Sequence, residues 1–217
     1  MKLELYVFPP SPRAFKVLAV ANHLGLDYET HIVDLVKGEQ KSPSYAALNP
    51  NMRMPTMKHG DYVLWESAAI QQYLAMQKPE SRLLPTEEKA RLDVMRWQCW
   101  DLAHWDPSCA VFIFENFVKP TFMGINEPDR AALDKVQELF HRAAKVLDSQ
   151  LKGKPFVTGE QLAVADFALG APLNLATLAR IPLEPYAEIR RWFDTLRALP
   201  AWQRTLAQSA PPTAHAA

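Results

Sequence analysis

The strongest constraint on the fold is a change of sequence pattern near residue 80. Before this point, short apolar runs typical of strands alternate with helical segments, whereas the rest of the chain carries only helical periodicity. Residues 79–86 are rich in proline and polar side chains, which is typical of a linker. We therefore expect a small α/β domain over residues 1–78 and an all-helical domain over residues 87–217.

The first 78 residues predict the order strand, helix, strand, a poorly defined helical segment, hairpin, helix. Strands are expected at 3–8, 28–33, 56–58 and 62–65, and helices begin at Ser11-Pro12 and at Ser67. Beyond the linker, helical periodicity covers 87–117, 128–151, 164–178 and 185–199. Pro107 should kink the first of these because proline removes a backbone donor. The tail from Ser209 to Ala217 is expected to be disordered.

Charge and cysteine content exclude several classes of protein. The 217 residues include 24 basic and 24 acidic side chains, so the chain lacks the basic surplus of a nucleic-acid binder. The sequence has no signal-peptide pattern, and no apolar run reaches the roughly 18 residues that a membrane span needs. Cys99 and Cys109 would lie about 15 Å apart on one helix, too far for a disulfide. Because their spacing also fits no zinc site, we expect a cytoplasmic protein without a metal.

Three short motifs in the first domain carry possible chemistry. Ser11 follows the first strand and precedes a proline, which places its hydroxyl at a helix N-terminus, where anions are stabilised. A thiolate held there would have a lowered pKa. The same residue is also a good N-cap, and the sequence alone leaves both readings open.

The other two motifs flank the predicted hairpin. Met54-Pro55 precedes its first strand, where a proline is also ordinary as an edge feature. Glu66-Ser67 follows its second strand and begins the next helix. Ser67 can serve as an N-cap, or it can hold a ligand carboxylate while Glu66 takes an ammonium group, a combination suited to an α-amino acid.

In this order, the motifs resemble the N-terminal domain of cytosolic glutathione transferases. The resemblance covers essentially the whole chain and is nearest to the serine-type members of the phi and theta classes. It rests on Gly38-Glu39-Gln40-Lys41, Asn49-Pro50, Arg53-Met54-Pro55, Asp61 through Glu66-Ser67-Ala68-Ala69-Ile70, Phe114-Glu115 and Val118-Lys119-Pro120. It implies a thioredoxin-like domain that binds glutathione, followed by an all-helical domain that completes the site for the electrophile.

The resemblance also implies roles for individual residues. Ser11 would hydrogen-bond the glutathione sulfur as the catalytic group, since Val7 stands where tyrosine-type members have tyrosine and no cysteine lies near Ser11. The residues expected to bind glutathione are Gln40 and Lys41 at the glycyl end, Arg53, Met54 and cis-Pro55 at the cysteinyl unit, and Glu66 and Ser67 at the γ-glutamyl end.

Two positions depart from the family pattern. Gln40 stands where the phi pattern has histidine, so its contact with the glycyl end is in question. Ala163 stands at the cap of a core helix where the family has serine or threonine, while Asp166 is retained three residues later. We expect Asp166 still to stabilise that helix start.

The site for the electrophile is less well defined. Pro10, Trp105, Cys109 and Phe112 are the candidates for an acceptor-substrate pocket, although helix packing explains the aromatic residues equally well. His104 is expected to be an interior histidine, and Asp101 to approach the partner subunit's glutathione.

The sequence thus predicts a homodimeric detoxification enzyme that joins glutathione to small apolar electrophiles, with no metal, nucleic-acid or membrane partner. A glutathione-dependent peroxidase of organic hydroperoxides and a non-catalytic ligand-binding or interaction protein with the same fold remain as alternatives.

Overall fold

The computed structural model describes residues 2–209, which form two compact units. The first contains the chain up to Ser81 together with the segment from Ala198, and the second is Arg82–Arg197. Within residues 2–209, no helix has the length and apolar character needed to cross a bilayer.

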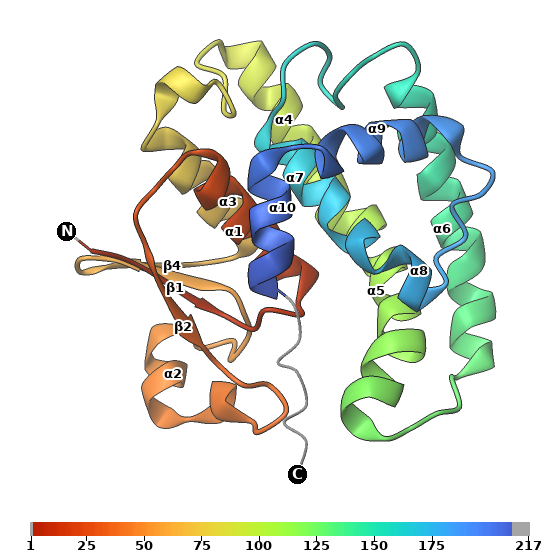
Figure 1. The fold of residues 1–217 in the computed structure, drawn as a ribbon, viewed down its shortest axis with the longest axis horizontal. Helices are drawn as coiled ribbons and strands as arrows, with labels where there is room; N and C mark the ends of the chain where they lie inside the picture. Colours follow the sequence, from red (N-terminus) through yellow and green to blue (C-terminus); the bar gives the residue numbers. More distant parts are fainter. Residues whose placement is uncertain (1, 210–217) are drawn as a thin grey trace. The chain divides into compact units, whose positions relative to one another are not determined.

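A four-stranded mixed sheet organises the first unit (Figure 1). Its strands are β1 (Leu3–Val7), β2 (Glu29–Ile32), β3 (Thr56–His59) and β4 (Tyr62–Trp65), in the order β2-β1-β3-β4. β2 is parallel to β1, whereas β3 is antiparallel to both β1 and β4. Leu3, Leu5 and Val7 are buried and alternate with less buried residues, as expected for a strand with one core face. The predicted thioredoxin-like arrangement is therefore confirmed.

Helices cover both faces of this sheet (Figure 1). α1 (Pro12–His23) and α3 (Ser67–Met76) pack together on one face, and α2 (Pro43–Leu48) lies on the other. Two short 3-10 turns complete the unit: η1 (Glu39–Lys41) comes directly before α2, and η2 (Pro79–Ser81) follows α3. Tyr45 of α2 packs with Tyr6, Phe8 and Val33 in a small cluster of its own. The poorly defined helical segment predicted between the second strand and the hairpin is thus a true helix, α2.

The last helix, α10 (Pro200–Ser209), belongs by its contacts to the first unit. The side chain of Asn22 on α1 donates to Thr205 Oγ1 and to Gln208 Oε1, each at 2.8 Å. Phe15 and Trp202 pack with ring centroids 4.9 Å apart. The predicted domain limits assigned this segment to the helical part, and those limits stay a prediction.

The last helix predicted from the sequence ends at residue 199, and no element is predicted for residues 200–208, where the structure has α10. Ser209, expected to begin a disordered tail, is instead the last residue of α10. The rest of the predicted tail, residues 210–217, lies outside the described residues.

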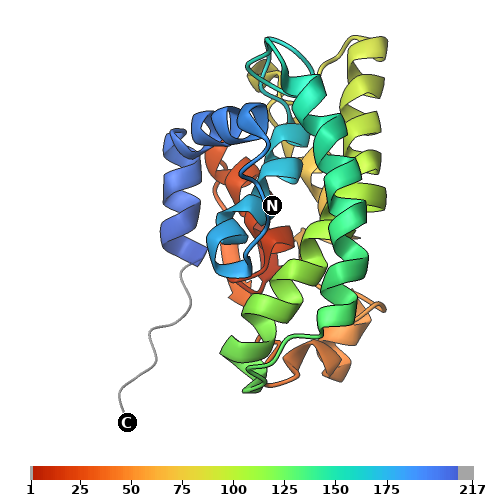
Figure 2. The ribbon, with the colours of Figure 1, turned by 90° about the vertical axis from the view of Figure 1, so that its right-hand side faces the viewer.

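The second unit is built from helices, with an isolated bridge between Phe156 and Gly159. The helices are α4 (Glu88–Trp100), η3 (Asp101–Trp105), α5 (Asp106–Ile113), η4 (Phe114–Met123), α6 (Arg130–Leu151), α7 (Val164–Gly170), η5 (Ala171–Leu175), α8 (Ala176–Ala179) and α9 (Ala187–Arg197). α5 and α6 run side by side (Figure 2). Between them the fully buried Trp105 stacks on Phe140, and its indole N–H donates to the Leu169 carbonyl at 2.8 Å.

A π-helical segment lies close to Pro107, where the sequence predicts a kink. η3 is π-helical and ends directly before α5, with the Asp106 N–H bonded to the Asp101 carbonyl. Pro107 has no N–H to donate, and its ring would crowd the carbonyl four residues earlier in a regular α-helix. A second proline, Pro120, lies within the π-helical η4. The long helix thus stays continuous by locally changing its hydrogen-bond register.

Asp166 holds together the core of the second unit. Its side chain is fully buried and accepts hydrogen bonds from the Ala163 N–H (2.9 Å), the Val157 N–H (2.8 Å) and the Trp192 indole (2.9 Å). The expectation that Asp166 stabilises the start of α7 despite Ala163 at the cap is confirmed. Burial raises the pKa of this carboxyl from 3.8 to about 6, although the three donors oppose the shift.

Replacing Asp166 with alanine leaves these three buried donors without their acceptor. We expect Asp166→Ala to lower the free energy of unfolding by about 3 kcal/mol in urea, whereas Asp134→Ala on the exposed side of α6 should change it by less than about 0.5 kcal/mol. Because the pKa is higher in the folded state, the wild type should lose stability as the pH rises from 3.8 to about 6. If Asp166→Ala lost as much stability as the wild type over this pH range, the pH dependence could not be assigned to Asp166.

Candidate functional site

The hydroxyl of Ser11 is not used to cap the helix that it precedes. Ser11 occupies the N-cap position of α1 with φ −77° and ψ 125°, and its side chain makes no capping hydrogen bond. Its backbone is tied on both sides, with its N–H donating to the Phe8 carbonyl and its carbonyl accepting from Phe15, both at 2.9 Å. The half-buried hydroxyl is therefore available to a ligand at the positive end of α1.

The sheet register brings all three predicted motifs to one edge. Thr56 is paired with Tyr6 on one side and with Trp65 on the other. Met54-Pro55 directly precedes β3. It therefore lies beside the end of β1, from which the chain continues to Ser11, and beside the end of β4, from which it continues to Glu66. Residues far apart in the sequence meet there because β3 is antiparallel to both of its neighbours.

A buried polar network fixes the backbone on both sides of Met54-Pro55. The Tyr45 hydroxyl donates to the Arg53 carbonyl at 2.7 Å and lies 2.8 Å from Thr56 Oγ1. The Asn49 side-chain amide donates to the same two groups at 2.8 and 3.0 Å. Tyr45, Asn49 and Thr56 are each less than 5% exposed. Such a satisfied network rigidifies the segment that it surrounds.

The backbone of Met54 is left open between these anchors. The Met54–Pro55 peptide bond is cis, as the resemblance implies. Within residues 2–209, the Met54 N–H and carbonyl make no hydrogen bond. One donor and one acceptor in a fixed segment can pair with an extended peptide in the manner of an added strand.

Glu66 has an unusual backbone conformation at the start of α3. Its φ of 74° and ψ of 111° lie in a region that residues other than glycine rarely adopt. Glu66 occupies the N-cap position, so Ser67 is the buried first residue of the helix rather than its cap. Strain of this kind is concentrated at functional sites, and here it presents an exposed carboxylate beside a helix N-terminus.

The remaining predicted ligands lie on exposed or partly exposed segments. Lys41 and Arg53 are exposed, the former in η1 and the latter directly before Met54. Gln40 is half-buried, and its side-chain carbonyl is enclosed without a hydrogen-bond partner among the described residues. Among residues 2–209, no group of histidine, cysteine and acidic side chains is arranged to hold a metal ion.

The residues predicted to line an acceptor pocket have different surroundings. Pro10 is half-buried in the turn before Ser11. Trp105, Cys109 and Phe112 are at most 6% exposed, and the two aromatic rings pack on Phe140. Burial also raises the pKa of the Cys109 thiol, so this cysteine is unreactive. A contribution of these residues to a pocket stays a prediction.

Two further predictions on the same helix have different outcomes. His104 is exposed, so the expectation of an interior histidine is wrong. It directly precedes the buried Trp105 in η3, and one step along a helix turns the side-chain direction by about 100°. Asp101 is 1% exposed, and its approach to a partner subunit stays a prediction.

Comparisons with known proteins match this geometry. The family model described as glutathione S-transferase, N-terminal domain, matches residues 1–76, and that of the C-terminal domain matches residues 109–200. Glutathione S-transferase 3 of Zea mays is 34% identical over 212 residues, covering 94% of this chain and 93% of the relative.

The chain belongs to the glutathione S-transferase family.

Solved structures agree with this membership. Glutathione S-transferase III in its apo form has a TM-score of 0.86 at 30% identity, covering 98% of this chain and 99% of the other. A glutathione transferase family member of Pseudomonas fluorescens Pf-5, solved with two glutathione molecules bound, has a TM-score of 0.81 at 27% identity, covering 94% and 92% of the two chains. The expected membership and fold are thus confirmed for this glutathione S-transferase family member.

The Tyr45 hydroxyl should control the order of the segment around Met54. We expect Tyr45→Phe to lower the free energy of unfolding by about 1 kcal/mol, because it removes the hydroxyl from two buried groups. Amide hydrogen exchange of a peptide covering residues 53–57 should become faster. Tyr62→Phe, on an exposed strand of the same sheet, is the control. Equal effects of the two variants would show that Tyr45 does not hold this segment.

Proposed function

We propose that this chain is an enzyme that transfers the thiolate of glutathione to small apolar electrophiles. The observation that carries the proposal is the free Ser11 hydroxyl at the N-terminus of α1, on the sheet edge that also holds the open Met54 backbone and Glu66-Ser67. The names of the relatives and the glutathione found with a structural neighbour support the same function.

The chemistry assigned to Ser11 is stabilisation of a sulfur anion. Its O–H donates a hydrogen bond to the glutathione sulfur, and the α1 N-terminus adds partial positive charge. Together they lower the pKa of the bound thiol from its ordinary value of about 8.5, so that more of it is ionised at neutral pH. The thiolate then forms a carbon–sulfur bond with the electrophile, which either expels its leaving group or takes up a proton.

The other motifs position the tripeptide for this step. The Met54 N–H and carbonyl pair with the cysteinyl backbone, with Pro55 and Arg53 beside them. Glu66 takes the γ-glutamyl ammonium, while Ser67 and the helix-start amides hold its carboxylate. Lys41 takes the glycyl carboxylate, and the enclosed side-chain carbonyl of Gln40 is available to an N–H donor of the same unit. Catalysis here is positioning combined with preorganised electrostatics.

We also assign the acceptor pocket to Pro10 and to the α4–α5 region that contains Trp105, Cys109 and Phe112.

For the assembly we propose a cytoplasmic homodimer acting in detoxification. Leu92, Met95 and Leu102 support the dimer, because each is at least 40% exposed and their spacing places them on one side of the α4–η3 helix. Sedimentation equilibrium tests the dimer, and we expect the measured mass to be that of two chains.

Removing the Ser11 hydroxyl should impair the reaction more than binding. We expect Ser11→Ala to lower kcat with an aryl halide about 100-fold, while the KM for glutathione changes little, because the hydroxyl acts on the developing thiolate. Ser149→Ala, at an exposed position of α6, is the matched control.

An organic hydroperoxide should be assayed beside the aryl halide. Turnover of the hydroperoxide alone would favour a peroxidase instead of conjugation. A wild type that fails to bind glutathione would favour a non-catalytic protein.

A further inference from the structure

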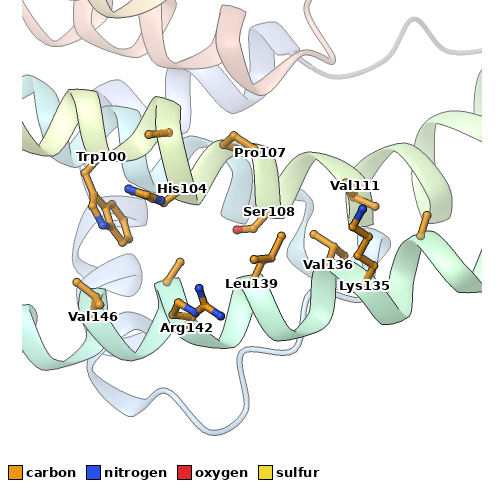
Figure 3. A pocket seen from close by; sticks show the side chains of 13 residues that line it. Trp100, His104, Pro107, Ser108, Val111, Lys135, Val136, Leu139, Arg142 and Val146 are labelled. Atoms are coloured by element: carbon orange, nitrogen blue, oxygen red, sulfur yellow. The ribbon is translucent and has the colours of Figure 1, made fainter.

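The helix that begins after Ser11 is buried on every side. Each residue of α1 from Ala14 to Asn22 is buried, and nine successive residues point in all directions around a helix. Helix α6 shows the contrast, because its Leu139 and Val146 line a groove beside α5 and each remains 48% exposed (Figure 3). To be covered in this way, α1 needs a neighbour on each of its sides.

The neighbour that completes this covering comes from the far end of the sequence. Both α3 and α10 pack against α1, and Figure 1 shows α10 beside it. The hydrogen bond from Asn22 to Thr205 joins positions 183 residues apart. The first 78 residues, predicted to form the glutathione-binding domain, therefore leave one side of α1 uncovered.

One contact with α10 lies on the turn of α1 that begins at Ser11. The Phe15 N–H donates to the Ser11 carbonyl at 2.9 Å, which ties the two residues into the first turn of the helix. The Phe15 ring packs on Trp202 with centroids 4.9 Å apart and ring planes at 60°. Phe15 is 3% exposed and Trp202 is fully buried. Because close-packed side chains do not shift independently, Trp202 restrains the turn that holds Ser11.

A second contact lies at the other end of α1. The Asn22 side-chain amide donates to Thr205 Oγ1 and to Gln208 Oε1, each at 2.8 Å. Asn22 Oδ1 accepts from the Tyr28 hydroxyl at 3.0 Å. Asn22 is 9% exposed and Thr205 is fully buried, so these bonds are largely shielded from water. Helix α10 thus holds α1 at both ends, by ring packing at the first turn and by hydrogen bonds at the last.

The role assigned to Ser11 is sensitive to small displacements. A hydrogen bond to sulfur weakens steeply as its angle departs from linearity, and a functional side chain must lie within about 0.5 Å of its productive position. The Ser11 side chain makes no capping hydrogen bond to its own helix, so the backbone at the start of α1 determines where the hydroxyl lies. Whatever fixes α1 therefore also fixes the Ser11 hydroxyl.

We propose that α10 is a positioning helix for Ser11, acting through the contact of Trp202 with Phe15 and through the hydrogen bonds of Asn22. This inference rests on the proposed function, because it concerns the thiolate that Ser11 stabilises. Trp202 and Asn22 act through α1 and are positioning residues, whereas Ser11 is the catalytic one. The activating site thus needs the last helix of the described chain as well as the sheet.

The pH dependence of the reaction separates positioning from stability. Trp202→Leu keeps an apolar side chain on α10 but removes the ring that packs on Phe15. We expect it to raise the pKa of the bound glutathione thiol by about 1, because a displaced Ser11 stabilises the thiolate less. Thiolate absorbance measures this pKa directly. With an aryl halide, kcat should fall about tenfold at pH values below the wild-type pKa and recover at high pH, while the KM for glutathione changes little.

Trp192→Leu is the matched control. Trp192 is also a fully buried tryptophan, but it lies on α9 in the second unit. Its replacement should lower thermal stability and leave the thiol pKa and the pH profile of kcat as in the wild type. Thr205→Val is a milder variant that removes the hydroxyl bonded to Asn22 with little change of shape. It should raise the thiol pKa by a smaller amount, which keeps the test available if Trp202→Leu does not fold.

A double variant tests the route through Phe15. Phe15→Leu and Trp202→Leu remove the two sides of one contact. Their effects on the thiol pKa should therefore not add, and Phe15→Leu/Trp202→Leu should resemble the single variants. Additive effects would exclude this contact as the route.

Three further results would overturn the proposal. A kcat that falls equally at every pH, or an equal rise of the thiol pKa in Trp192→Leu, would mean that lost stability alone explains the effect. An unchanged thiol pKa in Trp202→Leu and Thr205→Val, with the shift still lost in Ser11→Ala, would exclude α10 and leave the proposed function intact. An unshifted thiol in the wild type would refute the role of Ser11 and, with it, the positioning role of α10.

Discussion

The placement of β3 between β1 and β4 is the constraint on which the candidate site depends. Thr56 pairs with Tyr6 on one side and Trp65 on the other, and this register brings the chain before β3, the chain after β1 and the chain after β4 to one edge. A slip of one residue would reverse the side chains of β3 between the two faces. The Thr56 hydroxyl, bonded to Tyr45 and Asn49, would then leave the network that anchors Met54-Pro55.

The parts of the site that the sequence predicted are those marked by a short motif at the end of a strand or the start of a helix. A strand followed by Ser-Pro, a proline before a hairpin and Glu-Ser at a helix start are each short patterns with a physical cause. The strands were predictable for the same reason, because burial on one face forces the alternation seen in β1. Pro107 and Asp166 likewise act through their nearest turns: a π-helical segment lies directly before α5, and Asp166 accepts from the Ala163 N–H at the start of α7. The kink predicted at Pro107 stays a prediction.

Features that depend on packing between distant segments were not predictable. The Tyr45 hydroxyl of α2 donates to the Arg53 carbonyl of the following loop, and no motif around Tyr45 indicates that role. Nothing in the sequence indicates the positive φ of Glu66, because glycine is the residue that normally marks a positive φ. The exposure of His104 beside the buried Trp105 depends on how η3 packs against α6. Pro200 at the start of α10 was the available signal for a separate helix.

We propose that Ser11 lowers the thiol pKa of bound glutathione. The most direct measurement is the ultraviolet absorbance of the thiolate of bound glutathione as a function of pH, in the wild type and in Ser11→Ala. We expect the bound thiol of the wild type to titrate well below about 8.5, and the variant to bind glutathione but to lose most of this shift. An unshifted thiol in the wild type, or an equal shift in both proteins, would contradict it.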